Sequence, residues 1–135
     1  MKRRITYEDL HSLTKEQVQK LRDWWNPNIG DWFYNPNYVI NNRVIVRLSD
    51  DESIFYSSHK STATQFTKNK CMPLLDIGQM IDILKKKEWV LKINQSNEGS
   101  FRVELDCING VSFYRTELCN ALWNAVKFTL EERYI

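Results

Sequence analysis

The residues that could carry out chemistry are few and scattered. Acid–base and nucleophilic catalysis normally need a base, most often histidine, held beside a nucleophile. The chain has two histidines, His11 and His59, and both lie beside segments that we expect to be loops. It contains no phosphate-binding glycine loop, no dinucleotide fingerprint and no Cys-x-x-Cys pair. We therefore expect no catalytic residues and no cofactor, and a protein that is not an enzyme.

A short acidic run is the one candidate site for a hard cation. Asp50, Asp51 and Glu52 are adjacent, and carboxylate oxygens are ligands that calcium and magnesium prefer. No further ligands follow at spaced positions. The favoured interpretation is therefore a solvated hairpin turn, and we expect no metal site.

Residues 57–73 form the most polar stretch, and we expect them to be a long loop. Long loops inside compact domains are often functional or mobile. The residues that would contact an anionic ligand or a nucleic acid are His59, Lys60, Phe66, Lys68 and Lys70. The favoured alternative is a solvated connector.

Three cysteines bear on the redox setting of the protein. Cys71, Cys107 and Cys119 are an odd number without paired spacing, which is typical of reduced thiols. Cys107 and Cys119 lie among apolar residues and are expected in the core. Cys71 lies in the polar stretch and is a candidate for exposure.

The first half of the chain is expected to contain a helix and an antiparallel meander. Thr14 begins a capping-box pattern, and apolar residues then recur at helical spacing as far as Trp25. Residues 32–34, 38–48 and 54–56 are rich in aromatic and β-branched side chains, which predicts three or four strands. A short helical piece is expected before them, at residues 6–10.

The second half predicts a helix, three antiparallel strands and a second helix. Asp76 and Thr116 are candidate N-caps for the two helices. Between the helices, apolar and polar residues alternate as in half-buried strands. Asn109-Gly110 is the strongest hairpin signal of the chain, because a tight turn needs positive φ at both central residues.

Length and composition favour one small α+β domain. The chain has 135 residues, is 42% hydrophobic and 13% aromatic with five tryptophans, and carries a net charge of +2. We expect antiparallel sheets and three main helices, at about residues 15–25, 77–87 and 117–131. Within the single domain 1–135, the expected parts are a helix with a β-meander at 1–56, the polar loop at 57–73 and the helix–sheet–helix part at 74–135.

Nucleic-acid binding is one alternative function. The order helix, three strands, helix is also the topology of a double-stranded RNA-binding domain. The last helix, however, carries only Lys127 before two glutamates, so the basic footprint of such a domain is missing. The basic start (Lys2, Arg3, Arg4) and the run 85–87 are interpreted as a solvated tail and a helix end.

The chain shows no sign of a membrane segment or a secretion signal. It has no run of about 18 apolar residues, and no apolar core follows the basic start. We expect a cytoplasmic protein without membrane contact.

Three motifs resemble short proteins encoded by phages and prophages of Gram-positive bacteria. They are Trp24-Trp25 with Pro27 and the run GDWFY at 30–34, the run MPLLDIGQMI at 72–81, and the run ELCNALWNAVK at 117–127. The resemblance does not include residues 43–70. It implies a phage setting within a bacterial host cell and assigns no catalytic residue.

The leading hypothesis is therefore a non-enzymatic accessory protein that binds a host protein, as an inhibitor of a bacterial defence system would. Trp24 and Trp25 cannot both face one core from adjacent helical positions, so one of them, with Tyr34 or Tyr38, is a candidate anchor for the partner. The alternative is that both tryptophans pack on opposite sides of their helix. A homodimer and a small anionic nucleotide are further alternatives.

Overall fold

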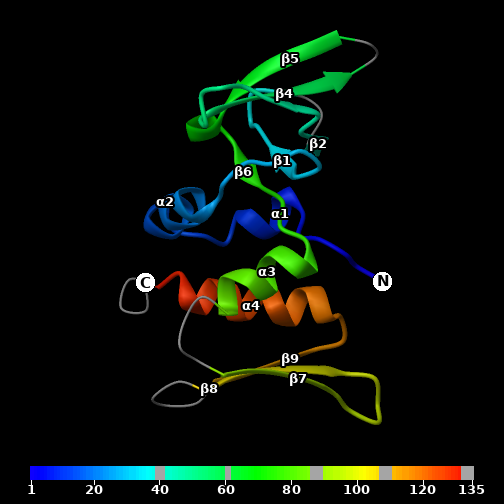
Figure 1. Cartoon of the computed structure of the whole chain (residues 1–135). Helices are drawn as coiled ribbons and strands as arrows, with labels where there is room; N and C mark the ends of the chain where they lie inside the picture. The colour runs from blue at the N-terminus through cyan, green and yellow to red at the C-terminus, as the bar shows by residue number, and fades with distance from the viewer. Residues whose placement is uncertain (39–41, 60–61, 86–89, 107–110, 132–135) are drawn as a thin grey trace. The chain divides into compact units, whose positions relative to one another are not determined.

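The structure is a computed structural model that describes residues 1–38, 42–59, 62–85, 90–106 and 111–131. It confirms the α+β class, with helices and small antiparallel sheets (Figure 1). Contacts divide the chain into two compact units. The N-terminal unit is Thr6–Leu75, and the C-terminal unit is Met1–Ile5 together with Asp76–Ile135.

The N-terminal unit begins with two capped helices, α1 (Tyr7–Leu10) and α2 (Lys15–Trp24). At the start of α2, the Gln17 amide N–H donates to Thr14 Oγ1 at 3.2 Å, and the Thr14 amide donates to Gln17 Oε1 at 2.8 Å. This exchange satisfies two amide groups that the first helical turn leaves unpaired. Both the capping box and the short first helix predicted from the sequence are confirmed.

The strands of this unit form two sheets rather than one meander. The first sheet has the order β2-β1-β6, and the second has the order β3-β4-β5. The strands are β1 (Trp32–Tyr34), β2 (Arg43–Val44), β3 (Arg47–Leu48), β4 (Ile54–His59), β5 (Thr62–Thr67) and β6 (Met72–Pro73). The prediction of a single sheet was wrong, because β2 pairs with β1 whereas β3 pairs with β4, and β6 joins the first sheet from far along the chain.

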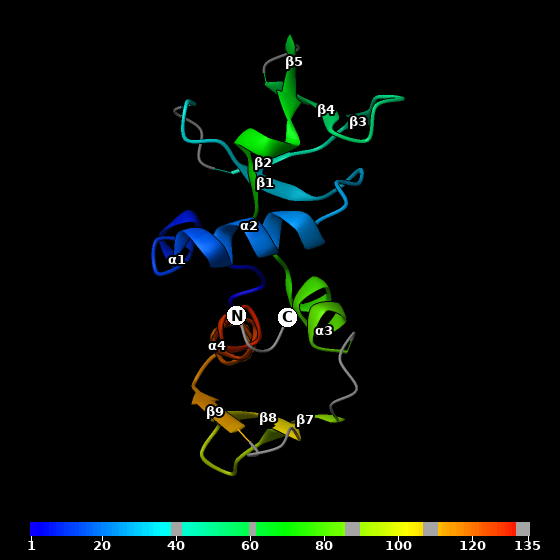
Figure 2. The ribbon, with the colours of Figure 1, turned by 90° about the vertical axis from the view of Figure 1, so that its left-hand side faces the viewer.

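The stretch 57–73, predicted to be a loop, is mostly regular structure. It forms the end of β4, all of β5, the 3₁₀ turn η1 (Lys68–Lys70) and β6. Figure 2 shows the β4–β5 hairpin at the end of its unit far from α2. Threonine is β-branched and suits a strand, but most of β5 is exposed or half-buried. Such a hairpin arm has the polar composition of a loop, which explains the wrong prediction.

The core of the N-terminal unit is built on aromatic side chains. The buried members are Trp25, Phe33, Ile45, Phe55, Phe66 and Cys71. The Phe33 ring lies 4.9 Å from both the Phe55 and the Phe66 ring centroids, edge to face in each case. Each such pair contributes about 0.5–1.5 kcal/mol beyond the burial of its area.

Cys71 is buried in this core, which corrects its expected exposure. The Asn35 amide Nδ2 donates to its sulfur at 3.5 Å. Burial raises the pKa of the Cys71 thiol to about 11, because the thiolate would lose its hydration. Cys119 is buried as predicted, and Cys107 lies outside the described residues.

The C-terminal unit has the predicted order of helix, three strands and helix. The elements are α3 (Ile77–Lys85), β7 (Val90–Gln95), β8 (Phe101–Asp106), β9 (Val111–Arg115) and α4 (Leu118–Thr129). The strands form an antiparallel sheet in the order β7-β8-β9, and both helices lie on one of its faces (Figure 1). Predictions that fall on Lys86, Lys87, Asn109 and Gly110 lie outside the described residues.

The two predicted caps of this unit have different outcomes. Asp76 caps α3 as expected, since its Oδ1 accepts from the Gln79 amide at 2.8 Å. Thr116 is not the cap of α4, because the helix begins one residue later, after Glu117. The Glu117 side chain makes no capping bond and instead accepts from the Lys2 amide at 3.2 Å.

The basic N-terminus is docked rather than solvated. Lys2 Nζ donates to Asn120 Oδ1 at 2.7 Å, and the Arg3 carbonyl accepts from the Ile77 amide at 3.2 Å. The segment therefore belongs to the C-terminal unit, and the interpretation as a free tail was wrong. In the described part of the chain, no helix has the length and apolar character needed to cross a bilayer.

Candidate functional site

A surface hollow of about 510 Å³ lies beside strand β5 in the N-terminal unit. One wall comes from the segment that follows β1, and the other comes from β5 and η1. The lining residues are Asn35, Asn37, Tyr38, Gln65, Phe66, Thr67 and Lys70. Among these described residues none carries a carboxylate, and Lys70 contributes a positive charge.

The segment after β1 is shaped by a turn around a buried asparagine. Asn35 Oδ1 accepts from the Asn37 amide at 2.9 Å, and the Asn35 carbonyl accepts from the Tyr38 amide at 3.2 Å. An asparagine that bonds its own backbone two residues later reverses the chain locally. The turn brings the Tyr38 ring to 4.9 Å from the Phe66 ring. One wall of the hollow is thus fixed to the other through two aromatic side chains.

Arg43, from strand β2, lies against both of these rings. Its guanidinium carbon is 5.2 Å from the Tyr38 ring centroid and 5.0 Å from the Phe66 ring centroid. These distances are within the range of cation–π attraction. The rings therefore hold the charge in place and offset part of the cost of its burial.

The hydrogen-bonding capacity of Arg43 is only partly used. The residue is 8% exposed, and its Nε and Nη1 are buried without a hydrogen-bond partner among the described residues. A buried cation without a counter-charge costs free energy that ring contacts do not fully return. An anionic group that reached these N–H groups would be bound by charge-assisted hydrogen bonds.

The structure brings together only part of the predicted anionic-ligand loop. Phe66 and Lys70 line the hollow, although Phe66 is buried and serves the core as well. Lys68 is half-buried in η1. His59 ends β4, where it pairs with Thr62 at the other end of the hairpin from Lys70. Lys60 lies outside the described residues.

Of the predicted partner anchors, the structure places two in or against the core. Trp25 is 1% exposed, packs edge to face on Phe55 and donates from Nε1 to Asp31 Oδ2 at 3.1 Å. Its assignment as a surface anchor is therefore corrected. Trp24 is half-buried and packs against the same core. Both tryptophans pack, as in the alternative, but against one core and not on opposite sides of the helix, because α2 ends at Trp24 and Trp25 has an extended backbone.

The two tyrosines differ in exposure. Tyr34 is half-buried and stacks on Tyr7 at 5.5 Å between ring centroids. Tyr38 is 39% exposed and lines the hollow. Among the four predicted anchors, Tyr38 is thus the most exposed.

Sequence reasoning missed Arg43, although a signal was present. Arg43 lies within the β-forming run 38–48, between Asn42 and Val44. A charged side chain in such a run is either at a solvent-facing position or buried with a special role, and alternation along a short strand does not distinguish these cases.

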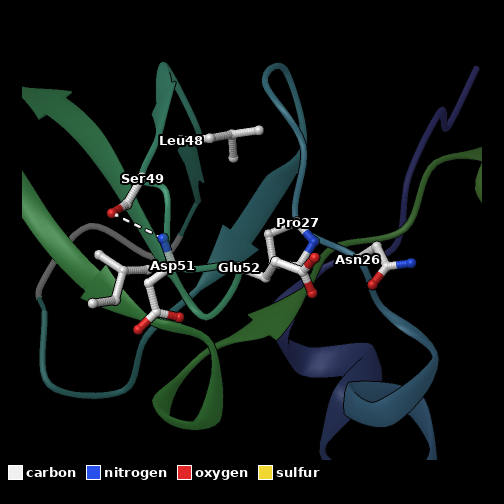
Figure 3. Close-up of a pocket in the computed structure, with 7 residues that line it drawn as sticks. Asn26, Pro27, Leu48, Ser49, Asp51 and Glu52 are labelled. Carbon is white, nitrogen blue, oxygen red and sulfur yellow. Dashed lines mark hydrogen bonds between the residues drawn. The ribbon is translucent and has the colours of Figure 1, made fainter.

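The acidic run forms a turn beside a second, smaller hollow of about 310 Å³ (Figure 3). The Ser53 amide and hydroxyl donate to Asp51 Oδ1 at 2.9 and 2.8 Å, and these bonds lower the pKa of the Asp51 carboxyl. Ser49 Oγ accepts from the Asp51 amide at 3.4 Å. Within the described ranges, no three His, Cys, Asp or Glu side chains gather as a metal site would require. The described contacts of Asp51 are those of a turn-forming residue.

Comparison with known proteins adds no assignment. No protein-family model, curated protein or solved structure matches this chain.

Proposed function

We propose that this chain is a phage- or prophage-encoded accessory protein that is not an enzyme and acts by binding a protein of the bacterial host. Inhibition of a host defence system in the cytoplasm is the role that fits such a protein. The observation that carries the proposal is the cluster of Tyr38, Arg43 and Phe66 at the hollow beside β5. Tyrosine and arginine are among the residues that contribute most of the binding energy at protein interfaces.

The geometry of this cluster favours tight binding of a partner. Two rings already hold the Arg43 guanidinium, so little side-chain entropy remains to be lost when it pairs with an anion. Tyr38 contributes an amphipathic surface with few rotatable bonds. A partner that covers the hollow would also exclude water from these contacts and so strengthen them.

A capture experiment tests the proposal. The purified chain is immobilised and exposed to lysate of a bacterial host, and retained proteins are identified and quantified against the amount of bait. Tyr38→Ala should reduce capture of a stoichiometric partner by about tenfold or more, as loss of an interface hot spot does. Tyr114→Ala is the matched control, because Tyr114 is 56% exposed and lies in the C-terminal unit. Capture that is equal for both variants, or no stoichiometric partner at all, would contradict the proposal.

A small anionic nucleotide is a second candidate ligand, favoured by the presence of Tyr38 and Lys70 on the same hollow. The Tyr38 ring would stack on the base, and the Lys70 ammonium group would contact the phosphates. Nucleotides that bind the folded state should raise the unfolding temperature with concentration. Sedimentation of the isolated chain tests the remaining alternative, a homodimer.

A further inference from the structure

Strand β5 is an edge strand without the features that usually protect such edges. It is the last strand in the order β3-β4-β5. Its sequence, Thr-Ala-Thr-Gln-Phe-Thr, contains no charged residue and no proline. Exposed edges normally carry lysine, proline or a bulge that prevents another strand from pairing with them. The edge of β5 is thus competent to accept a further strand.

The register shows which backbone groups this edge presents. The Lys68 amide donates to the Ser53 carbonyl at 2.7 Å, next to the pair Ile54↔Thr67. Since bonded and non-bonded pairs alternate in antiparallel sheets, the N–H and C=O groups of Ala63 and Gln65 face away from β4. The Tyr56 carbonyl, opposite Gln65, accepts from the Val46 amide at 2.9 Å toward β3, which agrees with this alternation.

These outward groups have no partner in the described part of the chain. No backbone bond joins Ala63 or Gln65 to any described residue outside the β4–β5 pair, and both residues are exposed. A strand added to β5 would therefore gain up to four backbone hydrogen bonds at these two positions.

The free edge leads to the hollow, and the buried arginine packs against two of the rings that line it. Gln65 belongs to the edge and also lines the hollow, together with Lys70. Arg43 lies against Phe66, the next residue of β5. A strand advances about 3.3 Å per residue, so a segment paired with Ala63 and Gln65 reaches the hollow within one or two further residues. Lys70 lines the hollow and Arg43 lies behind its rings, and both side chains are positive.

We propose that β5 binds an extended acidic segment of a partner protein as an added strand, with an Asp or Glu carboxylate of that segment accepting hydrogen bonds from the free N–H groups of Arg43. The inference rests on the proposed protein-binding function and names the chemistry of the bound segment. Backbone pairing along β5 supplies affinity, and the arginine supplies selectivity for an acidic side chain.

A display library of random peptides of about ten residues, selected on the full chain, tests the charge requirement. Enriched peptides should carry an Asp or Glu at a common position, and replacing that residue by its amide should weaken binding by about tenfold or more, measured by fluorescence anisotropy. Arg43→Gln should abolish the difference between acid and amide peptides. Arg47→Gln is the matched control, because Arg47 is an exposed arginine that stacks on Tyr56 at 4.1 Å on the neighbouring strand. No enrichment of acidic residues, or a preference that survives in Arg43→Gln, would overturn the proposal.

Two modifications test the strand pairing. Gln65→Pro removes an outward amide that the sheet itself does not use, and it should reduce peptide affinity by about tenfold or more while the circular dichroism spectrum is kept. The second modifies the peptide and leaves the protein unchanged. One peptide is N-methylated at the alternate amides that would face β5, and another at the amides that would face away from it. The first peptide should lose binding, and the second should keep it. Equal binding of both methylated peptides would exclude an added strand.

The results separate this inference from the proposed function. If Tyr38-dependent capture of a host protein holds but peptides show no acidic preference, the partner binds in another geometry. If acidic peptides bind as strands but no host protein is captured, the site is correct and the assigned setting is wrong.

Discussion

Replacing Asp31 by alanine should destabilise the N-terminal unit, because Asp31 satisfies a buried indole. Its Oδ2 accepts from Trp25 Nε1 at 3.1 Å and from the Asn28 amide at 3.0 Å. Trp25 is 1% exposed, so its indole N–H would be left without water when the carboxylate is removed. The Asn28 amide belongs to an exposed residue, and water can replace that bond.

The magnitude follows from these two environments. An unsatisfied buried donor costs about 1–3 kcal/mol, whereas a bond that water replaces costs about 0.5–1.5 kcal/mol. We therefore expect Asp31→Ala to lower the free energy of unfolding by about 2–3 kcal/mol. Asp31→Asn keeps an acceptor oxygen and should cost about 1 kcal/mol. In a double-mutant cycle with Trp25→Phe, the coupling energy should be about 1–2 kcal/mol, because either single change removes the same bond.

Urea unfolding followed by intrinsic fluorescence measures these values. Asp23→Ala is the matched control, since Asp23 is an exposed aspartate of α2 whose Oδ1 accepts from the nearby Gln19 Nε2 at 2.7 Å. The control should change stability by less than about 0.5 kcal/mol. If Asp31→Ala costs no more than the control, or its effect adds fully to that of Trp25→Phe, the bond does not contribute as argued.

Three further predictions concern stability. Thr14→Ala removes the N-cap of α2 and should cost about 1 kcal/mol in urea unfolding, with Thr14→Ser restoring most of it; an unchanged midpoint would contradict the role of the cap. Gly30 has a φ of 92° and open space around its missing Cβ, so Gly30→Ala should cost about 1–2 kcal/mol of stability through backbone strain alone. Gly78 lies in α3, where alanine has the higher helix propensity, so Gly78→Ala should stabilise the protein. A stable Gly30→Ala variant would refute the strain argument. The pKa of the Cys71 thiol is raised to about 11 from its usual 9.0. Between about pH 9 and 11 the thiol therefore stays protonated in the folded state while it ionises in the unfolded state. The free energy of unfolding should fall over this range by up to about 3 kcal/mol. Cys71→Ala should lack this component of the alkaline decline, and identical pH profiles would count against it.

Local patterns predicted local structure well. The bonds of Thr14 with Gln17 and of Asp76 with Gln79 each join residues three apart, so a short sequence window contains both partners. The alternation in β8 was equally readable, since Val103 and Leu105 are buried beneath the helices while their neighbours are not. In each of these cases, the residues that determine the local structure lie within a few positions of one another in the sequence.

Long-range pairing is where sequence reasoning failed. Phe33 pairs with Pro73 across the first sheet, and no local feature of the short β6 strand indicates that partner. The polarity of β5 concealed a strand, because its two faces are not both covered. The burial of Arg43 depends on rings that come from the segment after β1 and from β5. Each of these facts is set by tertiary contacts, which override local propensity.

The structure separates residues that hold the fold from residues with interactions still to make. In the run GDWFY at 30–34, Gly30 supplies a left-handed turn, Asp31 binds Trp25, and Phe33 fills the core. These roles use the side chains within the fold, so the first motif specifies a scaffold. The residues with donors that no described residue accepts from, Arg43 and Gln65, lie on strands β2 and β5, outside this run. The residues of this run that hold the fold and the residues with donors still to pair therefore lie in different segments of the N-terminal unit.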